Sequence, residues 1–317
     1  MTQNDILNQV EFEDRVAFGG WSIDLHPPGG MYAAESGSKH LQADGNYYIP
    51  FRSLYSRNVK NLLFAGRNIS ASHVAFGSTR VMATCAVMGE AAGVGAALSI
   101  DYRITPRELQ ANYMKIVQQT MLKQGASLLG VANEDDNDLA QQATVEGSSY
   151  CQQIEIREGR ERYSLIQNAG FLFPVDSQLE NISILLDASV PTIVEIEIWE
   201  TGKPQNYIPH SIMTRAIAEV AKGEKQWVKF EINNVVIKEL QNVFVIVKAN
   251  KDVALYLSAE PMTGVLSFKD AGAVKIQNLY EQIDSPVLRW SMKGLERKPF
   301  CFFCSRQNNS VFNRQGR

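Results

Sequence analysis

The segment from Asn61 to Gly95, NLLFAGRNISASHVAFGSTRVMATCAVMGEAAGVG, constrains the fold of this chain more than any other. Three apolar residues, Leu62 to Phe64, predict a short buried strand that ends in an Ala65-Gly66 turn. After a polar loop, Gly77 and Ser78 are expected to open a long helix of very small residues. Each glycine weakens a helix by roughly 1 kcal/mol relative to alanine, so close approach of a sheet or a ligand is expected to offset them.

The expected start of this helix has the chemistry of an anion site. A helix N-terminus carries roughly half a positive charge and several unpaired N–H groups. Gly77 would give access, Ser78 and Thr79 would add hydroxyls, and Arg80 would add a full charge. The same small residues would also let two helices pack tightly, so ligand binding and tight packing stay open as alternatives.

Bulk properties bound the classes of function. The 317 residues are enough for two domains, and the net charge of -3 gives no reason to expect nucleic acid or a membrane surface as a partner. No apolar run approaches the roughly 18 residues of a spanning helix. The start, MTQNDILNQVEFEDR, lacks the pattern of a signal peptide, so a cytoplasmic location is favoured, with the true N-terminus of a parent protein out of view.

Local patterns divide the chain. The first 60 residues, rich in glycine, proline and aromatic residues, predict loops and short strands. Thr105, Pro106 and Glu108 predict the capped start of a second helix that ends near Gly125. The acidic and polar stretch 133–149 predicts a solvated linker or helix cap, because it lacks the spacing of a calcium-binding loop.

Beyond Tyr150 the apolar residues alternate with a period of two, as in Ile182, Ile184 and Leu186. This pattern predicts an antiparallel β-sandwich over 149–317, of jelly-roll or galactose-binding-like type, with a tail from Pro299 that resembles a truncated strand. Its aromatic residues could form a carbohydrate-stacking platform or belong to the core: Trp199, Tyr207 and Trp227. The Cys301–Cys304 pair lacks a second pair of ligands, so no metal site is expected.

Three strings occur in the order typical of one family: GGWSIDLHPP, YYIPFRSLYSRNVKNLLFAGRNISASHVAFGSTRVMATCAVMGEAAG and DNDLAQQATVEGSS. They closely resemble FAD-dependent oxidoreductases of the two-dinucleotide-binding-fold type, over about Thr2 to Ser149. The resemblance implies that 1–148 is the C-terminal part of an FAD-binding domain of α+β or α/β class. The GxGxxG motif of the N-terminal half is absent before Asn61. That half is therefore an expected partner, and the isolated chain is expected to be inactive.

The resemblance also implies hydride transfer to FAD from an unidentified small-molecule substrate, with carbohydrate-related compounds among the candidates. Four residues match the segment that contacts the ribityl and pyrophosphate groups: Ala65, Gly66, Arg67 and Asn68. Many related enzymes have an aspartate after this glycine, so here that contact must differ. Four more would lie near the flavin pyrimidine edge: Gly77, Ser78, Thr79 and Arg80.

The candidates on the substrate side are Asp24, His26, Arg52 and His73. Imidazole titrates near neutral pH, so His26 or His73 could remove a hydroxyl or amine proton during hydride transfer. Structural roles are the alternative, in which Asp24 orients His26 or caps a turn and Arg52 binds a carbonyl group. His40 and His210 have no comparable context and are not candidates.

A second class of function is a non-catalytic carbohydrate- or protein-binding module that carries a residual flavoprotein core. An incomplete flavin domain would leave apolar surface exposed, and we expect it around Leu62 to Phe64 and along Val81 to Leu98. Aggregation or dimerisation of the isolated chain would follow.

Overall fold

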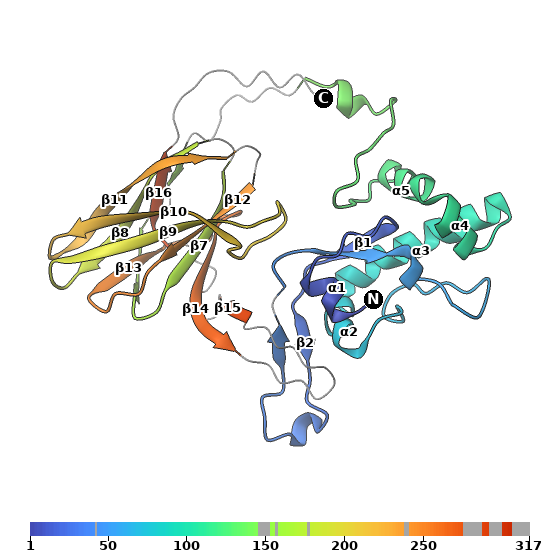
Figure 1. The fold of residues 1–317 in the computed structure, drawn as a ribbon, viewed down its shortest axis with the longest axis horizontal. Helices are drawn as coiled ribbons and strands as arrows, with labels where there is room; N and C mark the ends of the chain where they lie inside the picture. Colours follow the sequence, from blue (N-terminus) through green and yellow to red (C-terminus); the bar gives the residue numbers. More distant parts are fainter. Residues whose placement is uncertain are drawn as a thin grey trace. The chain divides into compact units, whose positions relative to one another are not determined.

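The computed structural model describes residues 1–41, 43–144, 153–155, 158–175, 178–237, 241–274, 287–291 and 300–305. Within it the chain divides into two compact units, Met1–Thr144 and Val145–Arg317, which we describe separately (Figure 1). The sequence prediction placed this boundary between 148 and 149, and residues 145–152 lie outside the described ranges.

Unit 1 combines a cluster of helices with short strands. Its helices are α1 (Gln3–Leu7), α2 (His73–Thr79), α3 (Met82–Tyr102), α4 (Pro106–Asn112) and α5 (Met114–Lys123), with 3-10 turns η1 (Gly30–Tyr32), η2 (Phe51–Ser53) and η3 (Leu139–Gln142). Two antiparallel pairs are formed by β1 (Arg15–Gly19) with β4 (Tyr47–Pro50) and by β2 (Ile23–Leu25) with β3 (Lys39–Leu41). The prediction of loops and short strands in the first 60 residues is confirmed.

The long helix α3 packs against β1, α4 and α5. Its buried side includes Met88, Ala91 and Val94, and the ring of Phe51 lies so close to Gly95 that a Cβ there would be 2.5 Å from it. By length and composition α3 could also cross a membrane, and 39% of its most apolar window is buried within the structure.

The predicted start of the long helix at Gly77 is wrong. Gly77 and Ser78 lie in the last turn of α2, Arg80 is the C-cap of α2, and α3 begins at Met82. The reason for the glycine is the approach of α2 to β2, because a Cβ at Gly77 would lie 2.8 Å from the carbonyl oxygen of Asp24. Close packing, one of the two alternatives, therefore explains Gly77.

The predicted strand Leu62–Phe64 is also wrong. Within the described residues only Leu63 pairs with another strand-like residue, as an isolated bridge with Tyr55. Leu62 is 43% exposed, so this apolar run is not buried as a central strand would be.

The capped start of the second helix is confirmed. The Glu108 carboxylate accepts from the backbone N–H of Thr105 at 2.8 Å, and the Thr105 hydroxyl accepts from the Glu108 N–H at 3.3 Å. The helix is interrupted at Tyr113, where φ is -134°, and so forms α4 and α5. Gly125, with φ of +91°, follows the end of α5 as predicted.

Part of the predicted linker belongs to unit 1. Lys115 of α5 lies 2.6 Å from the carboxylate of Glu134, and Lys123 lies 3.2 Å from that of Asp135. The side chain of Asp138 caps η3 by accepting from the Ala140 N–H. The acidic residues therefore hold the segment after Asn133 against α5 instead of forming a free linker.

Unit 2 consists of two antiparallel sheets. One has the strand order β10-β9-β12-β7-β14-β15, and the other has the order β5-β16-β8-β13-β6 with β11 also paired to β8 (Figure 1). The strands are β5 (Gln153–Glu155), β6 (Glu158–Ser164), β7 (Ala169–Val175), β8 (Gln178–Ala188), β9 (Thr192–Glu200), β10 (Ser211–Val220), β11 (Gly223–Val236), β12 (Gln241–Val247), β13 (Val253–Ser258), β14 (Leu266–Val274), β15 (Val287–Ser291) and β16 (Phe302–Ser305).

The two sheets of unit 2 share one hydrophobic core. Phe171 of β7 and Phe302 of β16 belong to different sheets, and their ring centroids lie 4.5 Å apart. Ile184 of β8 and Ile196 of β9 are fully buried in the same cluster. The predicted alternation is confirmed, and the tail after Pro299 supplies core residues. The jelly-roll or galactose-binding-like type stays a prediction.

The three aromatic residues of the predicted carbohydrate platform do not share one face. Trp199 and Tyr207 pack against a second cluster that contains Phe244 and Trp290 of the β9–β12 sheet. Trp227 lies on β11 of the other sheet and is 50% exposed. A single platform of all three rings is therefore wrong.

Candidate functional site

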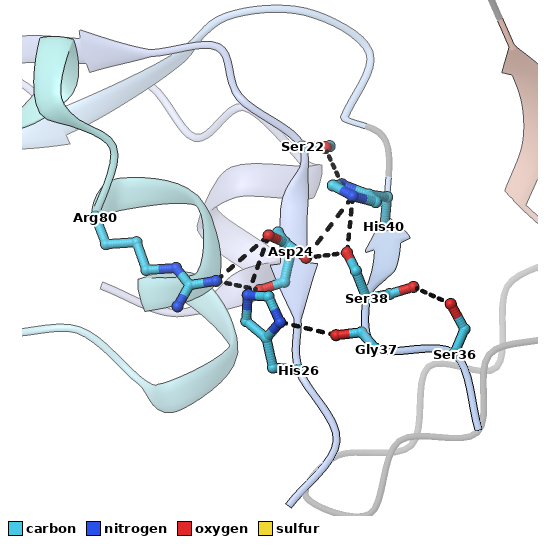
Figure 2. A network of polar contacts seen from close by, with 8 residues as sticks. All are labelled: Ser22, Asp24, His26, Ser36, Gly37, Ser38, His40 and Arg80. Atoms are coloured by element: carbon cyan, nitrogen blue, oxygen red, sulfur yellow. Dashed lines mark hydrogen bonds and ion pairs between the residues drawn. The ribbon is translucent and has the colours of Figure 1, made fainter. Parts of the chain in front are cut away.

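The hairpin of β2 and β3 brings together most of the polar side chains of the candidate site. Its register places Asp24 of β2 directly opposite His40 of β3. Close packing of α2 on β2 then brings Arg80, the C-cap of α2, to the same carboxylate (Figure 2). Residues that are 16 and 56 positions from Asp24 in the sequence thus meet at one side chain.

Asp24 is the centre of this network, and its side chain is 18% exposed. Its Oδ1 accepts a hydrogen bond of 2.5 Å from the Ser38 hydroxyl. Its Oδ2 lies 3.3 Å from His26 Nε2 and 3.4 Å from Arg80 Nη2, which also donates to the Asp24 carbonyl at 3.2 Å (Figure 2). Each carboxylate oxygen therefore has its own set of partners.

These partners decide the charge of Asp24. Burial raises the pKa of its carboxyl group, but the hydrogen bond from Ser38 and the charges of His40, His26 and Arg80 outweigh burial. The pKa is therefore lower than the ordinary value of 3.8, and Asp24 is an anion at neutral pH.

A backbone carbonyl fixes one ring nitrogen of His26, the other ring nitrogen faces Asp24, and about half of the side chain is exposed. Its Nδ1 lies 2.8 Å from the carbonyl oxygen of Gly37, and a carbonyl can only accept, so Nδ1 carries a proton. The nitrogen that gains or loses a proton is consequently Nε2, which faces Asp24. The side chain is 53% exposed, so His26 can exchange protons with a ligand or with solvent.

His40 completes the network, although the sequence analysis excluded it. Its Nε2 lies 2.9 Å from the Ser38 hydroxyl, and its Nδ1 lies 2.8 Å from the hydroxyl of Ser22 (Figure 2). The signal that could have found it is the pairing of SIDL with SKHL as two short strands, which sets Asp24 opposite His40.

Arg52, another catalytic candidate, does not join the network. Its Nε and Nη2 donate to the two carboxylate oxygens of Asp14, at 2.8 Å and 2.6 Å, and its backbone N–H also donates to Asp14. Asp14 is only 1% exposed. Arg52 therefore neutralises a buried carboxylate, which favours the structural alternative.

His73 is exposed and starts α2, whereas Arg80 follows its end. The structure groups Asp24 and His26, and the role of His73 stays a prediction.

The first four cofactor candidates form a turn in which Gly66 is buried and the other three residues are exposed. Gly66 has a φ of +119° and lies beside Cys85 in the first turn of α3, so that a Cβ added at Gly66 would be 3.6 Å from the Cys85 Cβ. Ala65, Arg67 and Asn68 are exposed. The Arg67 guanidinium lies over the ring of Phe76 at 5.5 Å, which still leaves its charge facing solvent.

The other cofactor candidates are mostly buried. Gly77, Ser78 and Thr79 are covered by the unit itself, and the Ser78 hydroxyl donates to the carbonyl of Trp21 at 2.6 Å. The Thr79 hydroxyl is buried without a hydrogen-bond partner among the described residues. Of these four, Arg80 retains an accessible side chain, 26% exposed, and its contact with a cofactor stays a prediction.

The first turn of α3 has the donors that a flavin or phosphate group requires. The first intrahelical bond runs from the Cys85 N–H to Val81 O, so the N–H groups of residues 82–84 have no acceptor within the helix. Met82 is 89% exposed and Ala83 is exposed, so this end of the helix is accessible. It adjoins Gly66, so a helix start and the glycine turn together fit part of an FAD molecule.

Comparison with known proteins agrees with this chemistry. Residues 1–121 match the family described as FAD dependent oxidoreductase, a stretch that ends within α5 and covers less than half of the chain. No curated protein matches the chain. The matched family depends on FAD, which confirms the predicted cofactor, and at this coarse level residues 1–121 are similar to flavin oxidoreductases.

Proposed function

We propose that unit 1 is the C-terminal part of an FAD-dependent oxidoreductase that transfers a hydride from a small-molecule substrate to the flavin. The family match over residues 1–121 carries this proposal. The half that contains the GxGxxG motif would be supplied by another segment or another chain.

The exposed face of α3 supports the need for such a half. A Cβ added at Gly89 or Gly93 would have no described atom within 4 Å, although each glycine weakens the helix by roughly 1 kcal/mol relative to alanine. Packing within the described residues therefore does not require either glycine. Met82 is 89% exposed, and Ile100, two residues beyond the range in which we expected exposed apolar surface, is 75% exposed. A backbone or ligand that docks closely on this face would account for both glycines.

On the cofactor side we assign binding to the Gly66 turn and the first turn of α3. Arg67 and Asn68 would contact the pyrophosphate, and the N–H groups at the start of α3 would stabilise negative charge on the flavin pyrimidine edge. Bound FAD would supply the hydride acceptor. Gly77 and Ser78 would support the site indirectly, by holding α2 on β2.

On the substrate side we assign the base to His26. Because Nδ1 donates to the Gly37 carbonyl, the lone pair of the neutral ring is on Nε2, the nitrogen that faces Asp24. After Nε2 takes a hydroxyl or amine proton, the Asp24 carboxylate 3.3 Å away stabilises the resulting cation. Arg52 would act only by keeping Asp14 paired, and His73 remains a candidate of its own.

The test is the colour of the completed protein. The coding sequence upstream of Met1 is searched for a predicted strand followed by GxGxxG. That segment is expressed together with the present chain as one joined chain, which is purified and scanned for flavin absorbance at about 450 nm. We expect yellow protein from the joined chain and little or no flavin from the present chain alone. His26→Asn serves as the control that should stay yellow, because His26 is assigned to substrate and not to FAD. A joined, folded chain that is colourless even after reconstitution with FAD would exclude the proposal.

A binding module is the second candidate, and one observation favours it. Trp199 is partly exposed, packs against the same cluster as Tyr207, and donates its indole N–H to Glu197 at 3.1 Å. Oligosaccharide binding that quenches tryptophan fluorescence and is lost in Trp199→Ala would support this candidate, and it would do so whatever the colour of the joined chain.

A further inference from the structure

The Ser38 hydroxyl fixes the direction of a chain of hydrogen bonds. It has one proton, and the Asp24 carboxylate at 2.5 Å can only accept, so that proton points to Asp24 Oδ1. The Ser38 oxygen must then accept at its other contact, from His40 Nε2 at 2.9 Å. His40 is therefore protonated on Nε2.

The other nitrogen of His40 agrees with this assignment. In the neutral ring Nδ1 is an acceptor, and the Ser22 hydroxyl at 2.8 Å can donate to it. The opposite tautomer would use the Ser38 proton for His40 and would turn a lone pair of Ser38 toward Asp24 Oδ1. It would also lose the electrostatic attraction between a proton on His40 Nε2 and Asp24 Oδ1, since these two heavy atoms lie 3.7 Å apart.

We propose that His40 is a positioning residue for the candidate base, acting through Ser38 and Asp24. The chain of donors runs from Ser22 through His40 and Ser38 to Asp24 Oδ1, and it leaves Oδ2 facing His26 and Arg80 (Figure 2). His40 thus selects which carboxylate oxygen meets His26 Nε2. The inference rests on the proposed function only for the role of His26, since the hydrogen-bond chain exists without flavin.

The test is the position of the proton on His40 in the full chain, without FAD. Long-range 1H–15N NMR spectra distinguish a protonated from a bare ring nitrogen, and they are recorded at a pH where the rings are neutral. Because the opposite tautomer loses the hydrogen bond from Ser38 to the charged Asp24 carboxylate, we expect a roughly tenfold excess of the Nε2–H form in His40. His210, which is exposed in unit 2, gives the internal reference for a ring without this constraint.

Variants then test whether His40 acts on His26. His40→Gln keeps an N–H donor for Ser38, whereas His40→Phe removes it. We expect His40→Phe to shift the ring signals of His26 and His40→Gln to leave them nearly unchanged. Lys39→Ala is the matched control on the same strand, because Lys39 pairs with Glu35 and lies outside the network.

Three outcomes would overturn the proposal: a proton on His40 Nδ1, equal shifts of His26 in the glutamine and phenylalanine variants, or an equal shift in Lys39→Ala. If His40→Phe does not fold, two other measurements decide the question: the proton position on His40 in the unaltered chain, and the decrease of the Nε2–H excess in Ser38→Ala, which removes the hydroxyl that fixes the direction. None of these spectra requires flavin, so their failure is distinct from that of a colourless joined chain.

Discussion

An alanine at Gly93 of α3 should stabilise unit 1, whereas an alanine at Gly95, two residues later, should leave unit 1 less stable than the Gly93 variant. A Cβ at Gly95 would lie 2.5 Å from the Cε2 and Cζ atoms of Phe51, but no described atom lies within 4 Å of a Cβ at Gly93. Phe51 is fully buried and packs on Tyr55 with 5.8 Å between ring centroids, so its ring cannot move aside freely.

The two substitutions share one energy term and differ in another. Both gain about 1 kcal/mol because alanine favours a helix interior more than glycine. Gly95→Ala alone adds the penalty for overpacking a core, about 1–3 kcal/mol. Gly93→Ala should therefore raise the free energy of unfolding by about 1 kcal/mol. The free energy of unfolding of Gly95→Ala should be about 1–3 kcal/mol lower than that of Gly93→Ala.

Urea unfolding of the full chain, followed by the helical circular dichroism signal, measures this difference. All described α-helices lie in unit 1, so the helical signal reports that unit and not the strands of unit 2. A Gly95→Ala variant as stable as Gly93→Ala would refute the packing of Phe51 on α3. In the joined flavoprotein, Gly93→Ala should instead lower FAD retention, because the added methyl group would separate the docked surface from α3.

Three further substitutions test the structure. Arg52→Ala removes the guanidinium from the buried Asp14 carboxylate, which keeps the hydrogen bond from the backbone N–H of residue 52. It should destabilise unit 1 by about 1–3 kcal/mol, less than for a fully buried pair because Arg52 is half exposed; urea unfolding measures this. Thr105→Ala should cost about 1 kcal/mol in the same assay. Hydrogen bonds from the Thr105 backbone and side chain lower the pKa of Glu108 below 4.5. The contribution of Glu108 to the stability of unit 1 is therefore present above pH 4.5 and is lost as the pH falls through the lowered pKa. In Thr105→Ala this loss of stability in acid should be smaller. Phe302→Ala should destabilise unit 2 by about 3–5 kcal/mol, measured by tryptophan fluorescence, and an unchanged transition would contradict a core shared by the two sheets.

The features predicted correctly from the sequence are local ones. The capping box of Thr105 and Glu108 spans three residues, and the alternation of Ile182 and Ile184 reflects the two-residue repeat of a strand. The flavin resemblance rests on long continuous strings and agrees with the family match over residues 1–121.

The wrong predictions concern segments whose surroundings decide their structure. Leu62 to Phe64 are apolar enough for a buried strand, but a strand needs a neighbouring strand to pair with, and within the described residues only the bridge at Leu63 forms. Gly77 and Ser78 were assigned to the wrong helix because the break is a single residue, Val81, whose ψ of 147° is extended, whereas Arg80 before it still has helical dihedral angles.

The sequence by itself determined the capped helices, the strand repeats and the cofactor class, because these depend on residues close together in the chain or on continuous strings. Only the tertiary structure decided that His40 belongs with Asp24 and that Arg52 belongs with Asp14. The β2–β3 register, and the approach of α2 that Gly77 permits, bring distant polar groups within hydrogen-bonding distance. Such contacts depend on how whole elements pack, and no short stretch of sequence specifies them.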